Sequence, residues 1–228
     1  MTQINPLMST EWYQGTPYNN SCPLINGSHA LVGCGAIAAG QIMKYHQWPI
    51  SYNWNDMPNS LAYTNLETTL SSFLYNVGVA MQTNYGLTAS SAFSYNIRMA
   101  LEAFDYSTSS VQTHSVLNVI SDLQGFRPVL ELGERMTPDN NIVGHAWVCD
   151  GFQREISYQE FSLQILSDVP PLSYIQASTS FFDNYLTSDS FHMKFNNGVA
   201  SNGWHYETSS SNVYTLNRCD IYNIHPNN

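Results

Sequence analysis

Helical sequence patterns fill the first half of this 228-residue chain, and strand patterns fill the second half. The clearest helix is predicted over residues 33–48, which are rich in Ala, Ile, Met and Gln and stop before Pro49. Its many small residues indicate burial on more than one face. Three further helices are predicted from the spacing of apolar residues and from serine N-caps: 66–75, Ser90 or Ser91 to Phe104, and 117–123.

Short apolar runs typical of strands follow from about residue 126. The predicted strands are 128–132, 145–149 (ended by Asp150 and Gly151), 161–166, 191–195 and 219–224. Residues 1–30, rich in Pro, Asn and Ser, predict an irregular arm. This order favours an α+β fold in one domain over 1–228, with a helical part over about 30–125 packed against a sheet part over about 126–228. A cleft between the two parts is the natural place for an active site.

The charge balance excludes two classes of partner. Seven Lys and Arg against seventeen Asp and Glu give a net charge of −10, whereas nucleic acids and anionic membranes require a basic surface. An aromatic content of 13% argues against disorder. No apolar run reaches the roughly 18 residues of a membrane-spanning helix, and the first residues lack the features of a signal peptide. The sequence therefore predicts no nucleic-acid partner and no membrane span.

Cys34 lies between two glycines at the first turn of the helix predicted over 33–48. The N-terminus of a helix carries free N–H groups and partial positive charge, so a thiol there ionises more easily. The flanking Gly33 and Gly35 are expected to leave room for a substrate backbone. Cys34 is therefore a candidate nucleophile. The competing interpretation is a small buried residue in an Ala- and Gly-rich helix.

His145 is the candidate base for this nucleophile. It begins an apolar strand after a polar loop, so its ring is expected at a strand end that faces the cleft. The competing interpretation is a histidine that only packs at the strand edge. Gln14 precedes Cys34 in the sequence and carries a side-chain amide, which suits an oxyanion hole beside the backbone N–H of the cysteine.

The other three cysteines, Cys22, Cys149 and Cys219, are interpreted as structural. Four cysteines permit two disulfides, but no pairing follows from the sequence. The sequence contains no Cys/His spacing of a zinc site, no phosphate-binding loop and no EF-hand loop. We therefore expect no cofactor and no metal.

Three segments around the candidate residues carry long motifs. They read Glu-Trp-Tyr-Gln-Gly-Thr-Pro-Tyr-Asn over 11–19, Gly-Cys-Gly-Ala-Ile-Ala-Ala-Gly-Gln-Ile-Met-Lys-Tyr-His-Gln-Trp-Pro over 33–49, and Gly-His-Ala-Trp-Val-Cys-Asp-Gly over 144–151. Residues 221–226, Ile-Tyr-Asn-Ile-His-Pro, add a weaker match. In these motifs the chain resembles the streptopain-type cysteine peptidases of peptidase family C10 over nearly its whole length.

The resemblance implies a papain-like fold and a secreted cysteine endopeptidase that cleaves polypeptides through an acyl-enzyme intermediate. Carried over position by position, Cys34 is the nucleophile, His145 the general base and Gln14 the oxyanion-hole donor, and the substrate backbone passes Gly144. The resemblance also implies export to the medium, the cell surface or the periplasm, and synthesis as a zymogen whose prodomain, or a similar inhibitor, is a partner. From the resemblance, we expect the chain to begin where the family's mature catalytic domain begins.

The third family motif, H-x-N-W-G-W-G-G-x-S-D-G, is altered here. Residues 191–204 read Phe-His-Met-Lys-Phe-Asn-Asn-Gly-Val-Ala-Ser-Asn-Gly-Trp, which puts Lys194 where the family has the Asn that orients the histidine. We expect Asn196, or a backbone carbonyl nearby, to take over this role at His145 Nδ1. Strand alternation places Asn196 on the face of Lys194, with Phe195 on the other face. The Lys194 ammonium is expected to reach solvent.

Two alternatives to an active peptidase remain open from the sequence. One is a catalytically impaired relative that binds a peptide, an inhibitor or a surface partner in the cleft, and Lys194 and the missing tryptophans favour it. The other is an acyltransferase or amidase that uses the same dyad. The segment between Gly151 and Phe191 is also longer than the family's usual hairpin. The presence of both Cys34 and His145 favours the peptidase.

Overall fold

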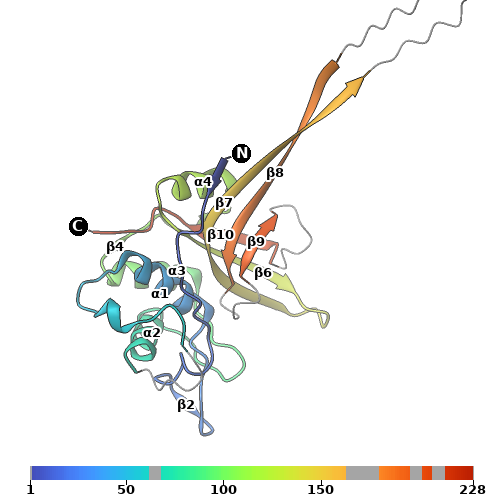
Figure 1. Cartoon of the computed structure of the whole chain (residues 1–228). Helices are drawn as coiled ribbons and strands as arrows, with labels where there is room; N and C mark the ends of the chain where they lie inside the picture. The colour runs from blue at the N-terminus through green and yellow to red at the C-terminus, as the bar shows by residue number, and fades with distance from the viewer. Residues whose placement is uncertain (1, 62–67, 163–179, 196–201, 207–213, 228) are drawn as a thin grey trace, which may run out of the picture.

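The computed structural model describes residues 2–61, 68–162, 180–195, 202–206 and 214–227. Its helices and strands are, in chain order, β1 Thr2–Ile4, β2 Leu24–Ile25, β3 Ser28–His29, α1 Cys34–His46, the 3₁₀ helix Trp54–Asp56, α2 Thr68–Ala80, α3 Ser94–Ala103, β4 Tyr106–Ser107, β5 Gln112–Thr113, α4 Val116–Gln124, β6 Val129–Met136, β7 Ile142–Ser162, β8 Ser180–Lys194, β9 Gly203–Tyr206, β10 Leu216–Ile221 and β11 His225–Pro226. In Figure 1, α1 to α3 gather on one side of a twisted sheet.

A seven-stranded antiparallel sheet forms most of the second half of the chain. Its strand order is β5-β10-β6-β7-β8-β9, and β1 joins by pairing with β7. β6 pairs with β7 over its whole length, so that Gly133 lies opposite His145 and Glu134 lies opposite Gly144. Helices first and strands later give the α+β arrangement that the sequence predicts.

The two faces of the sheet belong to two apolar cores. The sheet side chains that pack with α1, α2 and α3 are Leu130, Ala146, Val148 and Ile221. Those that pack with α4 are Val129, Trp147, Cys149, Phe152, Phe191, Met193 and Phe195. Because side chains alternate along a strand, neighbouring residues of β6 and β7 enter different cores. Burial of both apolar faces is the main force that holds helices and sheet together.

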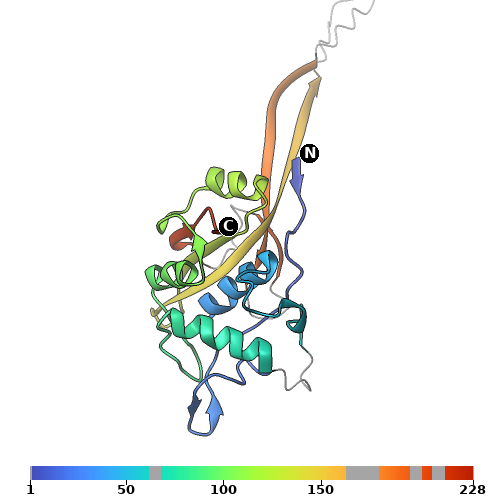
Figure 2. The ribbon, with the colours of Figure 1, turned by 90° about the vertical axis from the view of Figure 1, so that its left-hand side faces the viewer.

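β7 and β8 are much longer than the other strands and form a hairpin arm that leaves the body of the molecule (Figures 1 and 2). They pair from Val148 and Lys194 at the base to Ser162 and Ser180 at the outer end. The described parts of the stretch between Gly151 and Phe191 belong to this arm.

The predicted helices are present, with some ends shifted. α1 and α4 lie within two residues of the predicted ranges, while α2 continues to Ala80; residues 66 and 67 of its predicted range lie outside the described residues. The N-cap predicted for α3 at Ser90 or Ser91 is wrong, because α3 begins at Ser94 after Phe93. The Ser90 hydroxyl is used elsewhere, since it donates to the Leu31 carbonyl at 2.7 Å.

β7 does not end at Asp150 and Gly151 as predicted. Asp150 is fully buried, and its carboxylate accepts the Met8 N–H at 3.0 Å and lies 2.6 Å from Nδ1 of His192. The strand ladder only shifts its register between Cys149 and Gly151 and then continues. Hydrogen-bond partners from distant segments thus hold the Asp150 side chain within a continuous strand, although an Asp-Gly pair by itself signals a turn.

The remaining strand predictions fall on β6, β8 and β10. For the strand predicted over 161–166, residues 161 and 162 belong to β7, whereas 163–166 lie outside the described residues. The first thirty residues are irregular apart from the short β1, β2 and β3. Within the described part of the chain, no helix combines the length and the apolar character needed to cross a membrane.

Candidate active site

Cys34 is the first residue of α1. Gly33 precedes it as N-cap with a φ of 98°, a backbone conformation that favours glycine. The Gly33 carbonyl accepts the first helical hydrogen bond, from Ile37 N at 3.1 Å. Because the first N–H groups of a helix have no partner within it, Cys34 lies at the positive end of the helix dipole. The predicted position of Cys34 at a helix start is confirmed.

Gly35 serves packing rather than substrate access. A Cβ at this position would lie 2.8 Å from Cδ1 of Ile97 in α3, closer than two carbon atoms can approach without repulsion. The room expected beside Cys34 at Gly35 is therefore taken by Ile97. The missing side chain lets α3 lie directly against the first turn of α1.

Cys34 and His145 line one cavity of about 300 Å³ between the helical part and the sheet. β7 supplies His145 together with the neighbouring Gly144, and the segment that leads into α3 supplies a further wall. Gly144 faces open space, since a Cβ there would have only the Gly133 carbonyl oxygen near it, at 3.9 Å. The structure thus brings three of the predicted residues together, although 111 positions separate Cys34 from His145 in the chain.

A backbone carbonyl orients His145. The buried ring has its Nε2 atom 2.5 Å from the carbonyl oxygen of Phe195. A carbonyl oxygen only accepts hydrogen bonds, so Nε2 carries the proton and Nδ1 keeps the lone pair of the neutral ring. The Phe195 N–H in turn donates to Oδ1 of Asn202 at 3.0 Å. These contacts set both the orientation and the tautomer of the imidazole.

Three aromatic rings stack with His145. The Tyr214 ring lies 5.0 Å away at an interplanar angle of 26°, and the rings of Trp147 and Phe195 each lie 6.3 Å away at 18°. They surround the His145–Phe195 hydrogen bond with apolar surface, which strengthens it. Tyr214 was missed in the sequence, where its only signal is an aromatic residue shortly before the last predicted strand.

The third motif differs from its prediction in two respects. Phe195 shares the sheet face of His145, and the oriented nitrogen is Nε2 rather than Nδ1. The strand register explains the first point, because Lys194 pairs with Val148 and its side chain leaves on the opposite face. A backbone carbonyl, one of the two predicted partners, does contact the His145 ring. The other candidate, Asn196, lies outside the described residues.

Lys194 does not reach solvent, contrary to the prediction. Its side chain is 5% exposed, and Nζ donates to the Thr10 carbonyl at 2.9 Å. Burial lowers the pKa of Lys194, and the negative charges of Asp150 and Glu11 raise it. Lys194 therefore ties the N-terminal segment to the sheet, on the face that does not carry His145.

Burial raises the pKa of the Cys34 thiol above its ordinary value. Backbone hydrogen bonds at Ala146, Gly35 and Cys34 itself lower it by less. The net direction contradicts the easy ionisation expected at a helix start, because removal from water disfavours the thiolate more than the helix end favours it.

Burial also lowers the pKa of His145. The hydrogen bond to the Phe195 carbonyl raises it, and the positive charge of Arg135 lowers it further. The cation that acts on His145 is thus Arg135, whose guanidinium lies over the Tyr214 ring at 5.6 Å, rather than Lys194. Sequence reasoning did not identify Arg135.

Gln14 is held near the start of α1 by its backbone. Its carbonyl accepts the N–H of Val32, two residues before Cys34, at 3.0 Å. Among the described residues, those that line the cavity do not include Gln14. The oxyanion role of its side chain stays a prediction.

All four cysteines are free thiols. Cys22 and Cys149 are buried, as expected of structural residues, and burial raises the pKa of Cys22 to about 11. Cys219 differs, because it is partly exposed and lines the same cavity as Cys34. Burial raises the pKa of Cys219, as do the nearby acidic side chains of Asp220 and Glu134.

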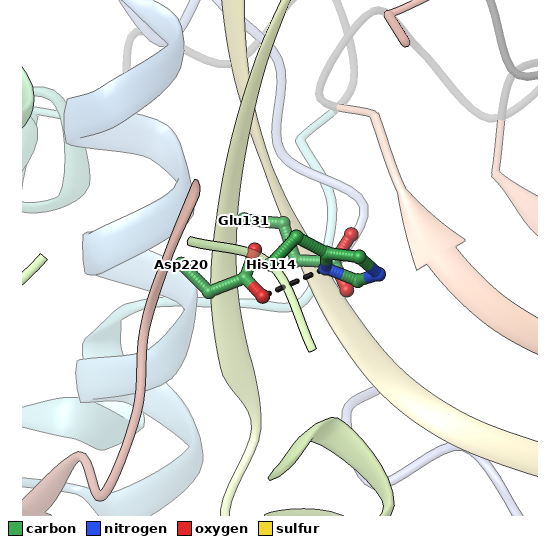
Figure 3. Close-up of side chains that lie close together, drawn as sticks. All are labelled: His114, Glu131 and Asp220. Atoms are coloured by element: carbon green, nitrogen blue, oxygen red, sulfur yellow. Dashed lines mark hydrogen bonds and ion pairs between the residues drawn. The ribbon is translucent and has the colours of Figure 1, made fainter. Parts of the chain in front are cut away.

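One group of described residues has the composition of a metal site: His114, Glu131 and Asp220 (Figure 3). Several of its donor atoms already have protein partners, whereas Oδ1 of Asp220 makes no hydrogen bond to the described residues. Oδ2 of Asp220 lies 2.7 Å from Nδ1 of His114, and Oε2 of Glu131 accepts from Trp147 Nε1 at 2.8 Å and from Arg218 at 3.0 Å. Since Arg218 already supplies positive charge, we interpret the group as a buried ion-pair cluster that holds Trp147 in place.

The chain is similar to two curated proteases over part of their length. It is 28% identical over 180 residues to the thiol protease/hemagglutinin PrtT of Porphyromonas gingivalis, with 62% of this chain and 20% of that protein covered. It is 28% identical over 192 residues to streptopain of Streptococcus pyogenes, with 60% and 46% covered. The chain therefore spans less than half the length of either relative.

Two solved structures share the fold. The active interpain A cysteine protease of Prevotella intermedia matches with a TM-score of 0.68 at 17% identity, covering 96% of this chain and 94% of that one. A prointerpain A fragment matches with a TM-score of 0.67 at 18% identity, covering 99% and 73%. At these identities the likeness shows the fold alone, and it confirms the predicted papain-like α+β architecture.

The sequence profile of the Peptidase C10 family matches residues 12–51 and 50–164. These ranges make up more than half of the chain and contain both Cys34 and His145. They also contain the motifs over 33–49 and 144–151 in full, and all of the motif over 11–19 except residue 11. The chain belongs to the peptidase C10 family.

Proposed function

We propose that this chain is a cysteine endopeptidase that cleaves polypeptides. The observation that carries the proposal is the single cavity shared by Cys34, at the start of α1, and His145, whose Nε2 contact leaves Nδ1 as the basic nitrogen. A nucleophilic cysteine and a histidine base in one cleft are the parts that this reaction needs. Membership of the C10 family supports the reaction class.

The first step joins proton transfer to attack. Because burial raises the pKa of Cys34 and lowers that of His145, we expect the thiol to pass its proton directly to His145 during the attack. His145 Nδ1 takes the thiol proton while the sulfur forms a bond to the scissile carbonyl carbon. The carbonyl π electrons move to its oxygen, and the backbone N–H of Cys34 and the side-chain amide of Gln14 donate to that oxyanion.

The second half of the cycle returns the proton. The C–N bond breaks as the oxyanion collapses, and His145 gives its proton to the leaving amine, which leaves a thioester on Cys34. A water molecule then attacks the thioester with His145 again as base, releasing the acid and restoring the thiol. The Nε2 proton stays on the ring throughout, because the Phe195 carbonyl accepts it.

The contact between His145 and Phe195 favours an active peptidase over an impaired relative. Loss of the orienting group in a serine triad costs about 10⁴ in turnover, but here the acceptor is replaced rather than lost. The rings of Trp147 and Tyr214 shield the pair in place of the missing family tryptophans. Lys194, the main argument for impairment, lies on the other face of the sheet.

The proposal includes export and a zymogen stage. The prointerpain A fragment, a precursor by its name, has this fold and extends beyond the part that this chain covers. By analogy, we expect a prodomain or a similar inhibitor to bind over Cys34 and His145 until it is removed. The resemblance to streptopain-type peptidases supports release from the cell.

Hydrolysis of casein and of quenched fluorescent peptides under reducing conditions tests the proposal. Cys34→Ala should abolish cleavage, and His145→Ala should lower it by roughly 10²–10⁴, with thermal midpoints close to that of the parent. An epoxide inhibitor should label one cysteine, mapped by mass spectrometry to Cys34. Cys22→Ala, which removes another free thiol outside the cavity, is the matched control and should keep its activity.

Each alternative has its own signature in this experiment. A parent chain that binds peptides but cleaves none would identify an impaired relative. Acyl transfer to added amines with no hydrolysis would identify a transferase. Activity that survives Cys34→Ala would refute the proposed nucleophile.

A further inference from the structure

Glu134 gives the active-site cavity a fixed acidic group. Among the described residues that line the cavity, the titratable ones are Cys34, Cys219, His145 and Glu134. Glu134 is the one carboxylic acid of this set. It lies near the end of β6 and is directly paired with Gly144 of β7. Asn217 Nδ2 donates to Glu134 Oε2 at 2.6 Å, which orients the carboxylate while Oε1 makes no hydrogen bond within the described part of the chain.

The space beside Glu134 is open where a substrate would lie. Its partner across the strands, Gly144, has no side chain, and the position of the missing Cβ has no atom closer than 3.9 Å. Gly144 directly precedes His145, so this space adjoins the reacting groups. The missing side chain of Gly144 therefore leaves space in the cavity next to Glu134.

The rest of the lining is apolar or neutral. Leu132, Ala146 and Ile97 line the cavity, and the Phe93 ring is 82% exposed at the start of α3. Arginine and lysine side chains have this same division, with an apolar stem below a cationic head. The stem fits the apolar lining and the Phe93 ring, which also attracts a cation over its face, and the head reaches the Glu134 carboxylate.

We propose that this cavity binds an arginine or lysine side chain of the substrate close to the scissile bond, and that Glu134 selects its positive charge. The inference rests on the proposed peptidase function, since Cys34 and His145 define where the scissile bond lies. The net charge of −10 also favours the approach of cationic peptides. No lysine or arginine among the described lining residues competes for Glu134.

The test compares kcat/KM for matched peptides that carry arginine, lysine, citrulline or norleucine at each of the three positions before the scissile bond. Citrulline keeps the shape of arginine without its charge. At one position we expect the parent to prefer arginine over citrulline by about tenfold or more, the size of one charge-assisted hydrogen bond. Glu134→Gln should abolish this preference by lowering kcat/KM for the arginine peptide more than for the citrulline peptide, and Glu134→Lys should reverse it.

The matched control is Glu155→Gln, which neutralises an exposed glutamate of β7 away from the cavity. It should keep the preference of the parent. The proposal is overturned if the parent shows no preference at any position, or if Glu134→Gln keeps the preference.

A binding measurement separates this proposal from the peptidase itself. The same peptides are titrated against Cys34→Ala, which lacks the nucleophile and keeps Glu134. Selective binding of the cationic peptides with no hydrolysis by the parent would refute the peptidase and leave the subsite. Hydrolysis by the parent with no selectivity in binding or cleavage would refute the subsite and leave the peptidase.

Discussion

The two sides of the cavity are built in different ways. The backbone position of Cys34 is set by one element, because Cys34 opens α1 and its neighbours in that helix are buried. His145 is held by segments far apart in the chain. Its Nε2 faces the carbonyl of Phe195, whose N–H is bound by Asn202, and its ring stacks on Tyr214, which precedes β10.

This difference follows from what each group needs. A nucleophile needs a position, which the start of a helix supplies from local sequence. A histidine base needs an orientation and one tautomer, which only a hydrogen-bond partner from another segment supplies. Any backbone carbonyl at the right place can be that partner, so the side chains of the third motif are free to change while the contact to His145 remains.

Apart from removal of Cys34 or His145 itself, the largest expected effect tests the nucleophile side. Gln14→Ala should lower kcat by roughly 10²–10³, with KM little changed, because the amide acts on the charge that develops at the oxyanion. Steady-state kinetics on a fluorescent peptide measure it. Gln3→Ala, at an exposed glutamine of β1, is the control, and an unchanged kcat for Gln14→Ala would remove Gln14 from the site.

The next effect tests the histidine side. Asn202→Ala removes the acceptor that fixes the Phe195 peptide and should lower kcat by about tenfold, the size of one hydrogen bond. KM should hold, and Asn202→Asp, which keeps an acceptor oxygen, should restore most of the rate. Asn118→Ala on the exposed face of α4 is the control. An equal kcat for Asn202→Ala and the parent would show that the position of the Phe195 carbonyl does not depend on the hydrogen bond to Asn202.

A smaller effect concerns the acid limb of the pH profile. His145 acts as a base only above its pKa, which burial and the charge of Arg135 lower. Arg135→Met removes that charge, so the pKa of His145 should rise and the acid limb of kcat/KM should move to higher pH by less than about one unit. Arg98→Met on α3 is the control. If the acid limb does not move, the charge of Arg135 does not affect the pKa of His145.

The smallest effect on activity is expected at Lys194. Lys194→Met leaves the Thr10 carbonyl without its donor, at a cost of about 1–3 kcal/mol. The thermal midpoint should fall by about 2–4 °C for each kcal/mol in a chain of this size, with kcat/KM unchanged at temperatures where the fold is intact. A rise in kcat/KM would mean that the positive charge of Lys194 does disfavour the protonated form of His145, even though the two side chains lie on opposite faces of the sheet.

Local patterns predicted the elements that depend on neighbouring residues. α1 begins at Cys34 and ends close to Pro49, because its glycine start and proline stop act within the segment itself. The strand with His145 was found for the same reason. Long motifs then identified the family, since they hold the residues on both sides of the cavity.

Contacts between distant segments could not be predicted. Every residue has a backbone carbonyl, so the acceptor at Phe195 has no signature in the sequence. Ser90 has the side chain of an N-cap but is engaged by Leu31. The direction of the Cys34 pKa shift depends on burial by the sheet, which opposes the local effect of the helix start.

The hairpin arm has a consequence for the accuracy of the site. Phe195 directly follows β8, whose ladder with β7 runs out to Ser162 and Ser180. A slip of one residue would turn every side chain to the other face and carry the Phe195 carbonyl away from His145. A slip of the whole ladder requires all of its pairs to break, those of the arm included, so a longer arm makes such a slip rarer. The backbone hydrogen bonds of the arm thus help to fix the position of the Phe195 carbonyl oxygen, although the arm itself lies away from the reacting groups.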